Sequence, residues 1–427
     1  MQGPKRRLEQ RGKLTLSFSF LPSSSYKYGA TAAHRNKPQG EGISRRLERQ
    51  KQPTAYNMGA EGLPRTATTN GETAPHHHPP QILGLQPAAL VDHVARVDLS
   101  LLDRIPGDRG GSIPVAIEEL DGILTEVKAH VLASPDGSSL AKTIAGGSVA
   151  NTIRGLSAGF GLSCGIIGAC GDDDQGRLFV SNMTFHGINI SRLRSKKGFT
   201  AQCVCLVDEL GNRTMRPCLS NAVKVQRRNS SDKVDLLLQW LVMRYSIFNL
   251  EVIKAAVKVA KQEGVSVSLD LASFEMVRNH RVPLMELLLS GDVDLCFANE
   301  DEATELLRGE AHADHEAALE FLAKHCRWAV VTLGANGCLA KHGKEVVRVP
   351  AIGESKAVDA TGAGDLFASG FLYGLTKGLS LEECCRFGSC SGGSVIRSLG
   401  GEVTPENWQW AYKQMQAKGL PIPEIRN

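Results

Sequence analysis

Short apolar segments alternate with segments of helical periodicity from residue 82 onward. Ile82 begins a short apolar strand that leads into a loop carrying Asp92, residues 150–158 suit the start of a helix, and residues 162–167 suit a buried strand. Further along we expect a helix at 251–263 and strands at 266–271, 293–298 and 329–333. This alternation predicts βαβ units and a parallel sheet, and no repeat of about 20–50 residues indicates a solenoid or propeller.

One segment follows a different pattern. Residues 201–207 and 213–218 resemble two strands joined by the polar turn at 209–212. Such a hairpin can project from the body of an α/β domain, so we expect a small β lid near residues 200–218.

Residues 1–81 contain Arg, Ser, Thr, Gln, Pro and Gly without a sustained apolar period. This composition is typical of a disordered leader or linker, and the histidines at 76–78 are assigned no function. The basic, acid-poor leader resembles a transit sequence in composition, although it lacks an evident amphipathic helix. Translation from Met58 is a further alternative. We therefore expect a leader at 1–81 and one α/β domain at 82–427.

The charge is unevenly distributed. Residues 1–57 carry 12 Lys or Arg and 3 Asp or Glu, whereas the remaining 370 residues have a net charge near −5. The body therefore lacks the basic excess of a nucleic-acid-binding domain, and small polar ligands suit it better. No apolar stretch approaches the roughly 18–20 residues that span a bilayer, so no membrane partner is expected.

Eleven cysteines are scattered along the chain, and some, such as Cys164, lie in apolar runs. An odd number in such surroundings indicates buried thiols in a reducing compartment rather than a disulfide framework. Cys203 with Cys205, and Cys384 with Cys385, lack matching partners at the spacing of a zinc site. We therefore predict no metal role for these four cysteines.

The strongest local motif is Asp-Ala-Thr-Gly-Ala-Gly-Asp at residues 359–365, followed by a segment of helical character. Gly362, Ala363 and Gly364 at a helix N-terminus can direct backbone N–H groups at a phosphoryl anion. Asp365 at the edge of that anion hole can accept the proton of an attacking hydroxyl, which makes it the candidate catalytic base. The alternative is a glycine-rich turn whose Asp caps a helix.

This motif resembles the C-terminal motif of the PfkB or ribokinase family of carbohydrate and nucleoside kinases. Residues 145–152, Ala-Gly-Gly-Ser-Val-Ala-Asn-Thr, resemble the family's N-terminal glycine motif. The resemblance implies that Gly146, Gly147 and Asn151 bind the substrate. It also implies that Asp92 accepts hydrogen bonds from a pair of substrate hydroxyls, as a carboxylate can. The alternative for Asp92 is a solvated loop acid.

Two further segments resemble family landmarks. Asn299 and Glu302 match an N-x-x-E motif, and the resemblance implies that they organise Mg²⁺ and the ATP phosphates, largely through water. Thr332, Gly334 and Gly337 match a T-x-G-x-x-G segment that lines the nucleotide pocket. The alternative for the first motif is the acidic start of a helix. The landmarks occur in the family's order over residues 82–410, which makes independent accidents improbable.

The chain departs from the family at one motif position and leaves the substrate open. Ala360 stands where many members have Thr, a change that catalysis should survive. The resemblance implies that Asp359 is a candidate K⁺ ligand. Residues 145–152, 270–274 and 294–302 look most like adenosine-kinase-like plant or bacterial members, which favours a nucleoside such as adenosine over a free sugar.

The sequence thus predicts a ribokinase-like α/β fold, a mostly parallel sheet flanked by helices with a small β lid. The predicted activity is ATP-dependent transfer of the γ-phosphoryl group to a sugar or nucleoside hydroxyl. The alternative is a catalytically silent regulatory or scaffolding relative, although the motif residues are retained. A nicotinamide oxidoreductase and a P-loop enzyme are disfavoured because neither glycine motif is present in the required context.

The quaternary structure and the location are less constrained. A monomer and a homodimer both fit, since exposed lid strands can pair between subunits. A cytoplasmic location is expected, and a plastid is the alternative if the basic leader is a transit peptide.

Overall fold

The computed structural model describes residues 79–130, 141–220, 223, 225, 238–353 and 357–424. These residues belong to one of the chain's two compact units, which includes His78–Asn427. The leader expected at residues 1–81 lies almost entirely outside the described residues, as do Met58 and the histidines at 76–78.

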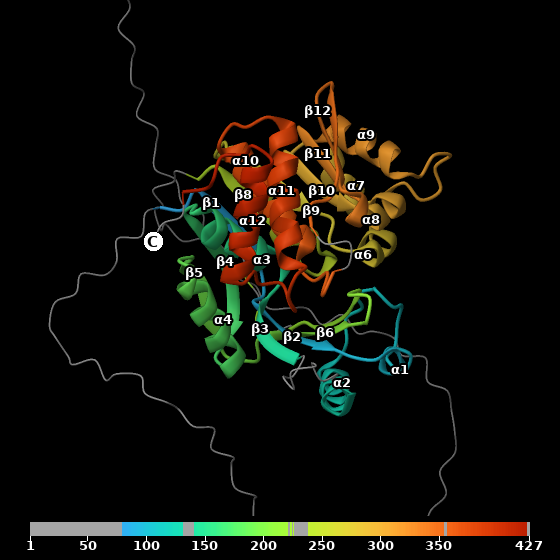
Figure 1. Ribbon diagram of the computed structural model, residues 1–427. Coiled ribbons are helices and arrows are strands. Elements are labelled where there is room, and N and C mark those ends of the chain that lie inside the picture. The colour runs from blue at the N-terminus through green and yellow to red at the C-terminus, as the bar shows by residue number, and fades with distance from the viewer. Residues whose placement is uncertain are drawn as a thin grey trace, which may run out of the picture. The chain divides into compact units, whose positions relative to one another are not determined.

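A large sheet runs through this unit (Figure 1). In spatial order its strands are β13 (Glu345–Val349), β12 (Cys338–His342), β11 (Trp328–Thr332), β10 (Leu295–Asn299), β9 (Ser266–Asp270), β8 (Trp240–Arg244), β1 (Ile82–Gln86), β4 (Cys164–Gly171) and β5 (Asn189–Lys196). All neighbours from β11 to β5 pair in parallel, and only β12 and β13 join in antiparallel pairs. The predicted, mostly parallel sheet is therefore confirmed, with the strands expected at 266–271, 293–298 and 329–333 in place.

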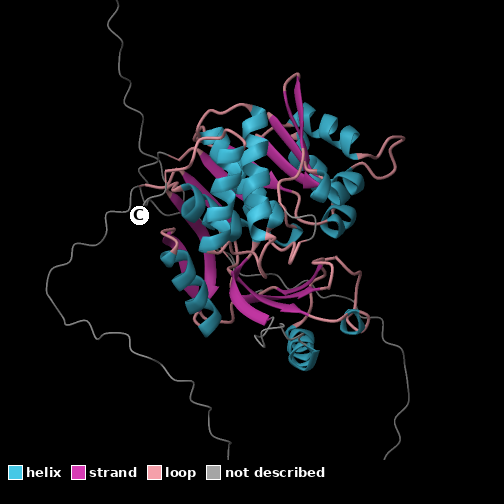
Figure 2. Ribbon diagram, in the orientation of Figure 1, coloured by secondary structure: helices cyan, strands magenta, loops and turns pink. Residues whose placement is uncertain are grey.

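Helices cover both faces of the sheet, as Figure 2 shows. One face packs on α3 (Ser148–Arg154), α4 (Asp174–Phe185), α10 (Ala363–Thr376), α11 (Leu381–Val395) and α12 (Pro405–Ala417). The other face packs on α5 (Leu250–Gln262), α6 (Phe274–Asn279), α7 (Arg281–Leu289), α8 (Glu300–Leu306) and α9 (His315–His325). The strands alternate between the two cores: Val242 contributes to the first, and its neighbours Leu241 and Met243 to the second. Burial on both faces explains why these strands are almost continuously apolar in sequence.

A second, smaller sheet has the order β3 (Ala141–Gly146), β2 (Leu90–Arg96), β6 (Ala201–Val207) and β7 (Arg213–Cys218). Strands β6 and β7 form an antiparallel hairpin at the position expected for the lid. The lid also includes β2 and β3, which the sequence had not assigned to it. The expectation that Asp92 lies in a loop is wrong, because Asp92 is a buried residue of β2 that pairs with both β3 and β6.

Both faces of the small sheet bury apolar side chains. One face, including Val204 and Leu206, packs on α1 (Leu99–Leu102) and α2 (Ile117–His130). The opposite face, including Val94, Cys203 and Cys205, forms a separate buried cluster. Alternation along β6 therefore buries every residue of its central part, and Cys203 and Cys205 share one face.

Helices α10 and α11 pack closely because glycines replace side chains where they meet. A Cβ atom on Gly370 would lie 2.4 Å from the carbonyl oxygen of Phe387 and 2.4 Å from Ser391 Oγ. Gly388 and Gly392 have similarly close neighbours across this interface. The short distance between the helices holds the N-terminus of α10 in one position against the sheet.

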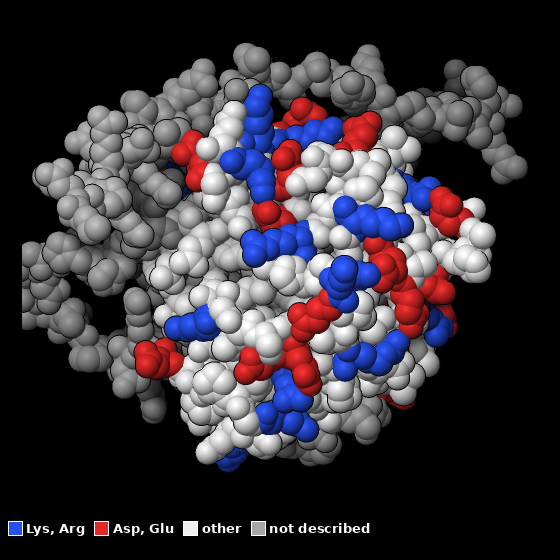
Figure 3. Space-filling view, turned by 90° about the horizontal axis from the view of Figure 1, so that it is seen from above, with Lys and Arg blue, Asp and Glu red and all other residues white. Residues whose placement is uncertain are grey.

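The surface seen from above carries both signs of charge interspersed rather than gathered into a field of one sign (Figure 3). Several of the exposed charges form local pairs, such as Arg348 with Glu316 and Lys254 with Glu286. In the part of the chain that the structure describes, no helix is long and apolar enough to cross a membrane.

We predict that Gly370→Ala destabilises the protein by about 1–3 kcal/mol, because the added methyl group must displace backbone of α11. Gly122→Ala is the matched control, because Gly122 lies within the exposed part of α2 and a Cβ there meets nothing within 4 Å. The control should be stabilised by about 0.5–1 kcal/mol through helix propensity. Denaturant unfolding of the three proteins measures both effects, and equal stability of the two variants would contradict the packing argument.

Candidate active site

Polar side chains collect where neighbouring parallel strands of the large sheet end. Arg244 ends β8, Asp270 ends β9, Asn299 ends β10 and Thr332 ends β11. The strand registers place Arg244 opposite Asp270, and Asn299 opposite Thr332. The carboxyl edge of an open α/β sheet is where ligands bind in this class of fold.

A cavity that is partly open to solvent extends along this edge under the small sheet. It brings together nine of the residues predicted from sequence, which come from both sheets and from the N-terminal ends of α3, α8 and α10. These residues are Asp92, Gly147, Asn151, Asn299, Glu302, Thr332, Gly362, Gly364 and Asp365.

The start of α10 forms one wall of this cavity. Gly362 is the N-cap, with a φ of 79° that favours glycine, and Gly364 is exposed in the first turn. Asp365, also in the first turn, is half-buried, and Asn151 Nδ2 donates a hydrogen bond to its Oδ2 at 2.9 Å. The first N–H groups of a helix have no intrahelical acceptor and carry its positive dipole end. A carboxylate and the unpaired N–H groups of a helix N-terminus therefore lie side by side.

Asn151 is itself held by a buried arginine that the sequence analysis had not singled out. Arg154 is 3% exposed, and its Nη2 donates to Asn151 Oδ1 at 2.7 Å and to the carbonyl of Gly401 at 3.1 Å. Its Nη1 donates to the carbonyl of Ala145 at 3.0 Å and to Asn182 Oδ1 at 2.9 Å. The guanidinium thus fixes which end of the Asn151 amide faces Asp365.

The Asp92 carboxyl group lies at the small-sheet side of the cavity. Burial raises its pKa to about 7, although the positive charge of Arg154 opposes that increase. Its Oδ1 is buried and has no hydrogen-bond partner among the described residues. Gly146 has to be glycine here, because a Cβ atom would lie 2.0 Å from Asp92 Oδ2. A ligand that carries hydroxyl groups could donate a hydrogen bond to this oxygen.

Gln86 at the end of β1 holds the glycine motif in place. Its Nε2 donates to the carbonyl of Gly146 at 3.2 Å, and its Oε1 accepts from the N–H of Ala150 at 2.9 Å. A Cβ atom on Gly147, whose φ is 93°, would lie 2.5 Å from the Gln86 amide. The two glycines therefore allow the chain to pass between Asp92 and Gln86.

A second group of carboxylates lies at the ends of β9 and β10. Asn299 caps α8 and accepts from the Glu302 N–H at 2.8 Å, while Glu302 Oε2 accepts from the Asn299 N–H at 2.9 Å. The motif therefore does begin a helix, and it also lines the cavity. Burial, and then the charge of Asp270, raise the pKa of Glu302 to about 8. Two carboxyl groups and an amide at the same edge of the sheet suit a hard divalent cation with its waters.

Arg244 connects this group to the glycine motif. Its Nη1 donates to Ser148 Oγ at 2.9 Å, its Nε lies 3.6 Å from Asp270 Oδ1, and its other terminal nitrogen contacts the carbonyl of Ala272. Ala272 has a φ of 81°, the one positive value among the non-glycine residues that the structure describes. Strained backbone of this kind is concentrated at functional sites. Arg213, from the lid strand β7, also lines the cavity.

Five predicted residues do not line the cavity. Gly146 supports Asp92 from behind, and Ala363 lies in the first turn of α10. Gly334 is exposed in the turn after β11. A Cβ atom on Gly337 would lie 2.0 Å from the carbonyl oxygen of Val349, so glycine at this position allows β12 and β13 to pair closely. Asp359 is buried, with its oxygens accepting from the backbone N–H groups of Thr361 and Gly400 at 2.8 and 2.6 Å.

The lid hairpin contacts the loop before α10. The N–H of Ala360 donates to the carbonyl of Gly211 at 2.9 Å, and Gly211 lies in the hairpin turn with a φ of 83°. The interaction uses the backbone of residue 360, so the side chain at that position is not needed for it. The turn of the hairpin therefore contacts the loop that precedes α10.

Sequence reasoning missed several residues of the cavity wall. They are Arg213, Arg244, Asp270, Ala272 and Thr361, together with the positioning residues Arg154 and Gln86. Arg244 and Asp270 follow apolar strand segments directly, so the rule that ligands bind at the carboxyl ends of parallel strands could have found them. Arg154 gave no comparable signal, because a lone arginine in a helix is usually exposed.

Solved structures with this architecture identify the class of fold. The structure of a probable sugar kinase from Rhizobium etli CFN 42 covers 80% of this chain and 99% of its own, with a TM-score of 0.67 at 27% identity. The structure of adenosine kinase from Sinorhizobium meliloti covers 79% of this chain and 99% of its own, with a TM-score of 0.67 at 28% identity. The fold is therefore the ribokinase-like fold predicted from the sequence.

The sequence matches the pfkB family of carbohydrate kinases over residues 133–407, and the chain belongs to that family. An uncharacterized sugar kinase from Archaeoglobus fulgidus is 29% identical over 58% of this chain and 96% of its own length. The probable fructokinase-5 of Arabidopsis thaliana is 29% identical over 64% of this chain and 88% of its own. The protein is a sugar or nucleoside kinase that uses ATP with a divalent metal ion.

Arg154, which holds Asn151, lies 4.0 Å from a carboxylate oxygen of Glu402, and this pair predicts a dependence of stability on pH. Burial opposes ionisation of Glu402, but hydrogen bonds from His186 and Asn182 and the charge of Arg154 outweigh it and lower the pKa of Glu402 to about 2. The unfolded-state pKa is about 4.3. The depressed pKa therefore stabilises the protein above about pH 4.3, and this stabilisation is lost as the pH falls towards 2.

Glu402→Gln should accordingly lower the free energy of unfolding by about 2 kcal/mol at pH 7. The difference from the wild type should narrow as the pH falls from about 5 to 3, which denaturant unfolding at several pH values measures. Glu345→Gln, which alters an exposed carboxylate of β13, is the control and should track the wild type. If the difference in unfolding free energy between Glu402→Gln and the wild type stays constant with pH, the ionised Glu402 carboxylate is not its origin.

Proposed function

We propose that the protein transfers the γ-phosphoryl group of ATP to a hydroxyl of a nucleoside or sugar, with Asp365 as the catalytic base. The observation that carries this proposal is the hydrogen bond of 2.9 Å from Asn151 to Asp365 at the N-terminus of α10. It supports a carboxylate held in one orientation beside a helix end that can receive an anion. An acceptor hydroxyl between them would meet a base on one side and the phosphoryl group on the other.

The acceptor is proposed to lie between the small sheet and α10. Asp92 would accept hydrogen bonds from a pair of its hydroxyls, and the backbone of Gly147 with the amide of Asn151 would orient it. Asp365 would take the proton of the attacking oxygen as the bond to phosphorus forms. The N–H groups of Gly362, Ala363 and Gly364 would stabilise the transferred charge.

The nucleotide and Mg²⁺ are assigned to the opposite end of the cavity. Thr332, with Gly334 and Gly337 in the turn that follows, would face the nucleotide. Asn299 and Glu302 would hold Mg²⁺ with its waters, and the bound ion would neutralise charge on the ATP phosphates. Asp359 is the candidate for a K⁺ site, although two backbone N–H groups already occupy its oxygens.

An adenosine-like nucleoside is the favoured acceptor. The likeness to the adenosine kinase of Sinorhizobium meliloti over 79% of this chain supports it, as do the apolar side chains of Leu90, Met215 and Phe297 in the cavity wall, on which a base could pack. A free sugar is the second candidate, because sequence relatives are named sugar kinase and fructokinase.

We predict that Asp365→Asn lowers kcat by about 100-fold or more, because general-base catalysis contributes about 10²–10⁴-fold, with little change in nucleotide affinity. The measurement is ATP consumption by the full chain with Mg²⁺ and K⁺ against a panel of nucleosides and sugars. Glu406→Gln is the matched control, since it removes a carboxylate from the first turn of α12 outside the cavity, and it should keep wild-type turnover. Turnover of Asp365→Asn within a few fold of wild type would exclude the assigned role.

A further inference from the structure

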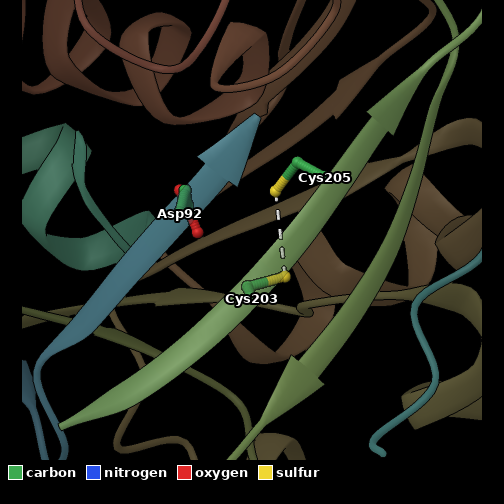
Figure 4. Close-up of side chains that lie close together, drawn as sticks. All are labelled: Asp92, Cys203 and Cys205. Atoms are coloured by element: carbon green, nitrogen blue, oxygen red, sulfur yellow. Dashed lines mark hydrogen bonds between the residues drawn. The ribbon is translucent and has the colours of Figure 1, made fainter. Parts of the chain in front are cut away.

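Asp92 has neighbours that its proposed role in acceptor binding does not use. Strands β2 and β6 are parallel, and their register places Asp92 opposite Cys203, with Cys205 two residues further along β6. The ligand atoms of the three side chains all lie within 4.8 Å of one another, and all three residues are buried. Figure 4 shows the carboxyl group of Asp92 beside the two sulfur atoms. No other group of three metal-ligating side chains is found in the part of the chain that the structure describes.

The spacing of the two sulfur atoms suits a tetrahedral metal ion. Cys205 Sγ and Cys203 Sγ are 3.8 Å apart, and the thiol of Cys205 donates a weak hydrogen bond to Cys203 Sγ. Two thiolates on one tetrahedral Zn²⁺, each about 2.3 Å from the metal, also lie about 3.8 Å apart. The pair could therefore bind such an ion without a large change in the position of β6.

The carboxyl group supplies an independent observation. Asp92 is 2% exposed, and its buried Oδ1 has no hydrogen-bond partner among the described residues. A buried oxygen without a partner is costly, and a ligand normally satisfies it. Asp92 also lines the cavity, whereas both thiols are fully buried behind it, so Asp92 is the one member of the group at the cavity wall.

We propose that Asp92, Cys203 and Cys205 form a binding site for a thiophilic divalent metal ion of the Zn²⁺ type. Two thiolates favour such an ion over Mg²⁺, which prefers oxygen ligands. On binding, the thiol protons of Cys203 and Cys205 pass to water and both sulfurs bond to the metal. With three protein ligands the ion keeps a fourth position for water, as open zinc sites do.

The ion would inhibit the kinase, an effect that rests on the proposed function of Asp92. A carboxylate oxygen bonded to the metal is lost as a hydrogen-bond acceptor for the substrate, so Asp92 could no longer hold a pair of hydroxyls with both of its oxygens. Inhibition should therefore be competitive with the acceptor and should leave the nucleotide end of the cavity unaffected. The sequence predicted no metal role for Cys203 and Cys205, because neither has a partner at zinc-site spacing along the chain. In the structure the third ligand comes from β2.

The test is direct titration of the metal-free full chain with Co²⁺, a spectroscopic substitute for Zn²⁺, in a buffer with a reductant that contains no thiol. We expect one equivalent to bind with a thiolate-to-metal charge-transfer band that Zn²⁺ displaces. Cys203→Ser, Cys205→Ser and Asp92→Asn should each weaken binding by at least about tenfold, and the cysteine variants should lose intensity in the band. Cys218→Ser is the matched control, because Cys218 is a buried cysteine of the same sheet that packs on the opposite face.

Absence of the band, or equal affinity in the Cys203→Ser, Cys205→Ser and Cys218→Ser proteins, would overturn the proposed site. Circular dichroism of each variant without metal verifies that it is folded, and Cys203→Ala with Cys205→Ala repeats the test with an apolar replacement. The titration does not need turnover, so its outcome is independent of the proposed phosphoryl transfer.

The inhibition is measured separately in the active protein at buffered free Zn²⁺. The apparent KM for the acceptor should rise with Zn²⁺ while kcat is unchanged, and Cys203→Ser should keep the basal activity and lose the effect. Inhibition that persists unchanged in Cys203→Ser would contradict the assignment of the effect to this site.

Discussion

The buried guanidinium of Arg154 is the interaction on which the geometry of the site depends. It donates to the carbonyls of Ala145 and Gly401 and to the side chains of Asn151 and Asn182, and so joins β3, α3, α4 and the loop before α12. A fully desolvated cation is stable only when its donors are satisfied in this way. The same bonds leave the amide nitrogen of Asn151 facing Asp365, so the structural solution for a buried charge also orients the candidate base.

Desolvated carboxyl groups define the two ends of the cavity. At one end burial raises the pKa of Asp92 to about 7, and at the other burial and Asp270 raise the pKa of Glu302 to about 8. Such groups favour ligands that supply hydrogen-bond donors or positive charge. A polyhydroxylated acceptor suits the first end and a hydrated divalent cation the second, and Asp365 lines the same cavity.

The small sheet has to bury both of its faces, which gives it more than one role. Its outer face is covered by α1 and α2, while its inner face carries Leu90, Asp92 and Met215 to the cavity and holds Cys203 and Cys205 behind them. The backbone contact between Gly211 and Ala360 seats the hairpin turn on the loop before α10. A lid built in this way can shield a reacting phosphoryl group from water and can also offer soft ligands beside the acceptor site.

Local patterns were sufficient to predict the elements and the motifs on them. Apolar segments of strand length predicted β9, β10 and β11, and a glycine-rich segment before a helical pattern predicted the N-terminus of α10, because backbone sterics and the period of burial act over a few residues. Only the tertiary structure decided which distant residues meet. It moved Asp92 from an expected loop to a buried strand, brought Arg154 to Asn151 and Gly401, and placed Asp92 beside two cysteines more than a hundred residues away. These outcomes depend on strand register and on the balance between desolvation and pairing, which are properties of the assembled sheets and not of any one segment.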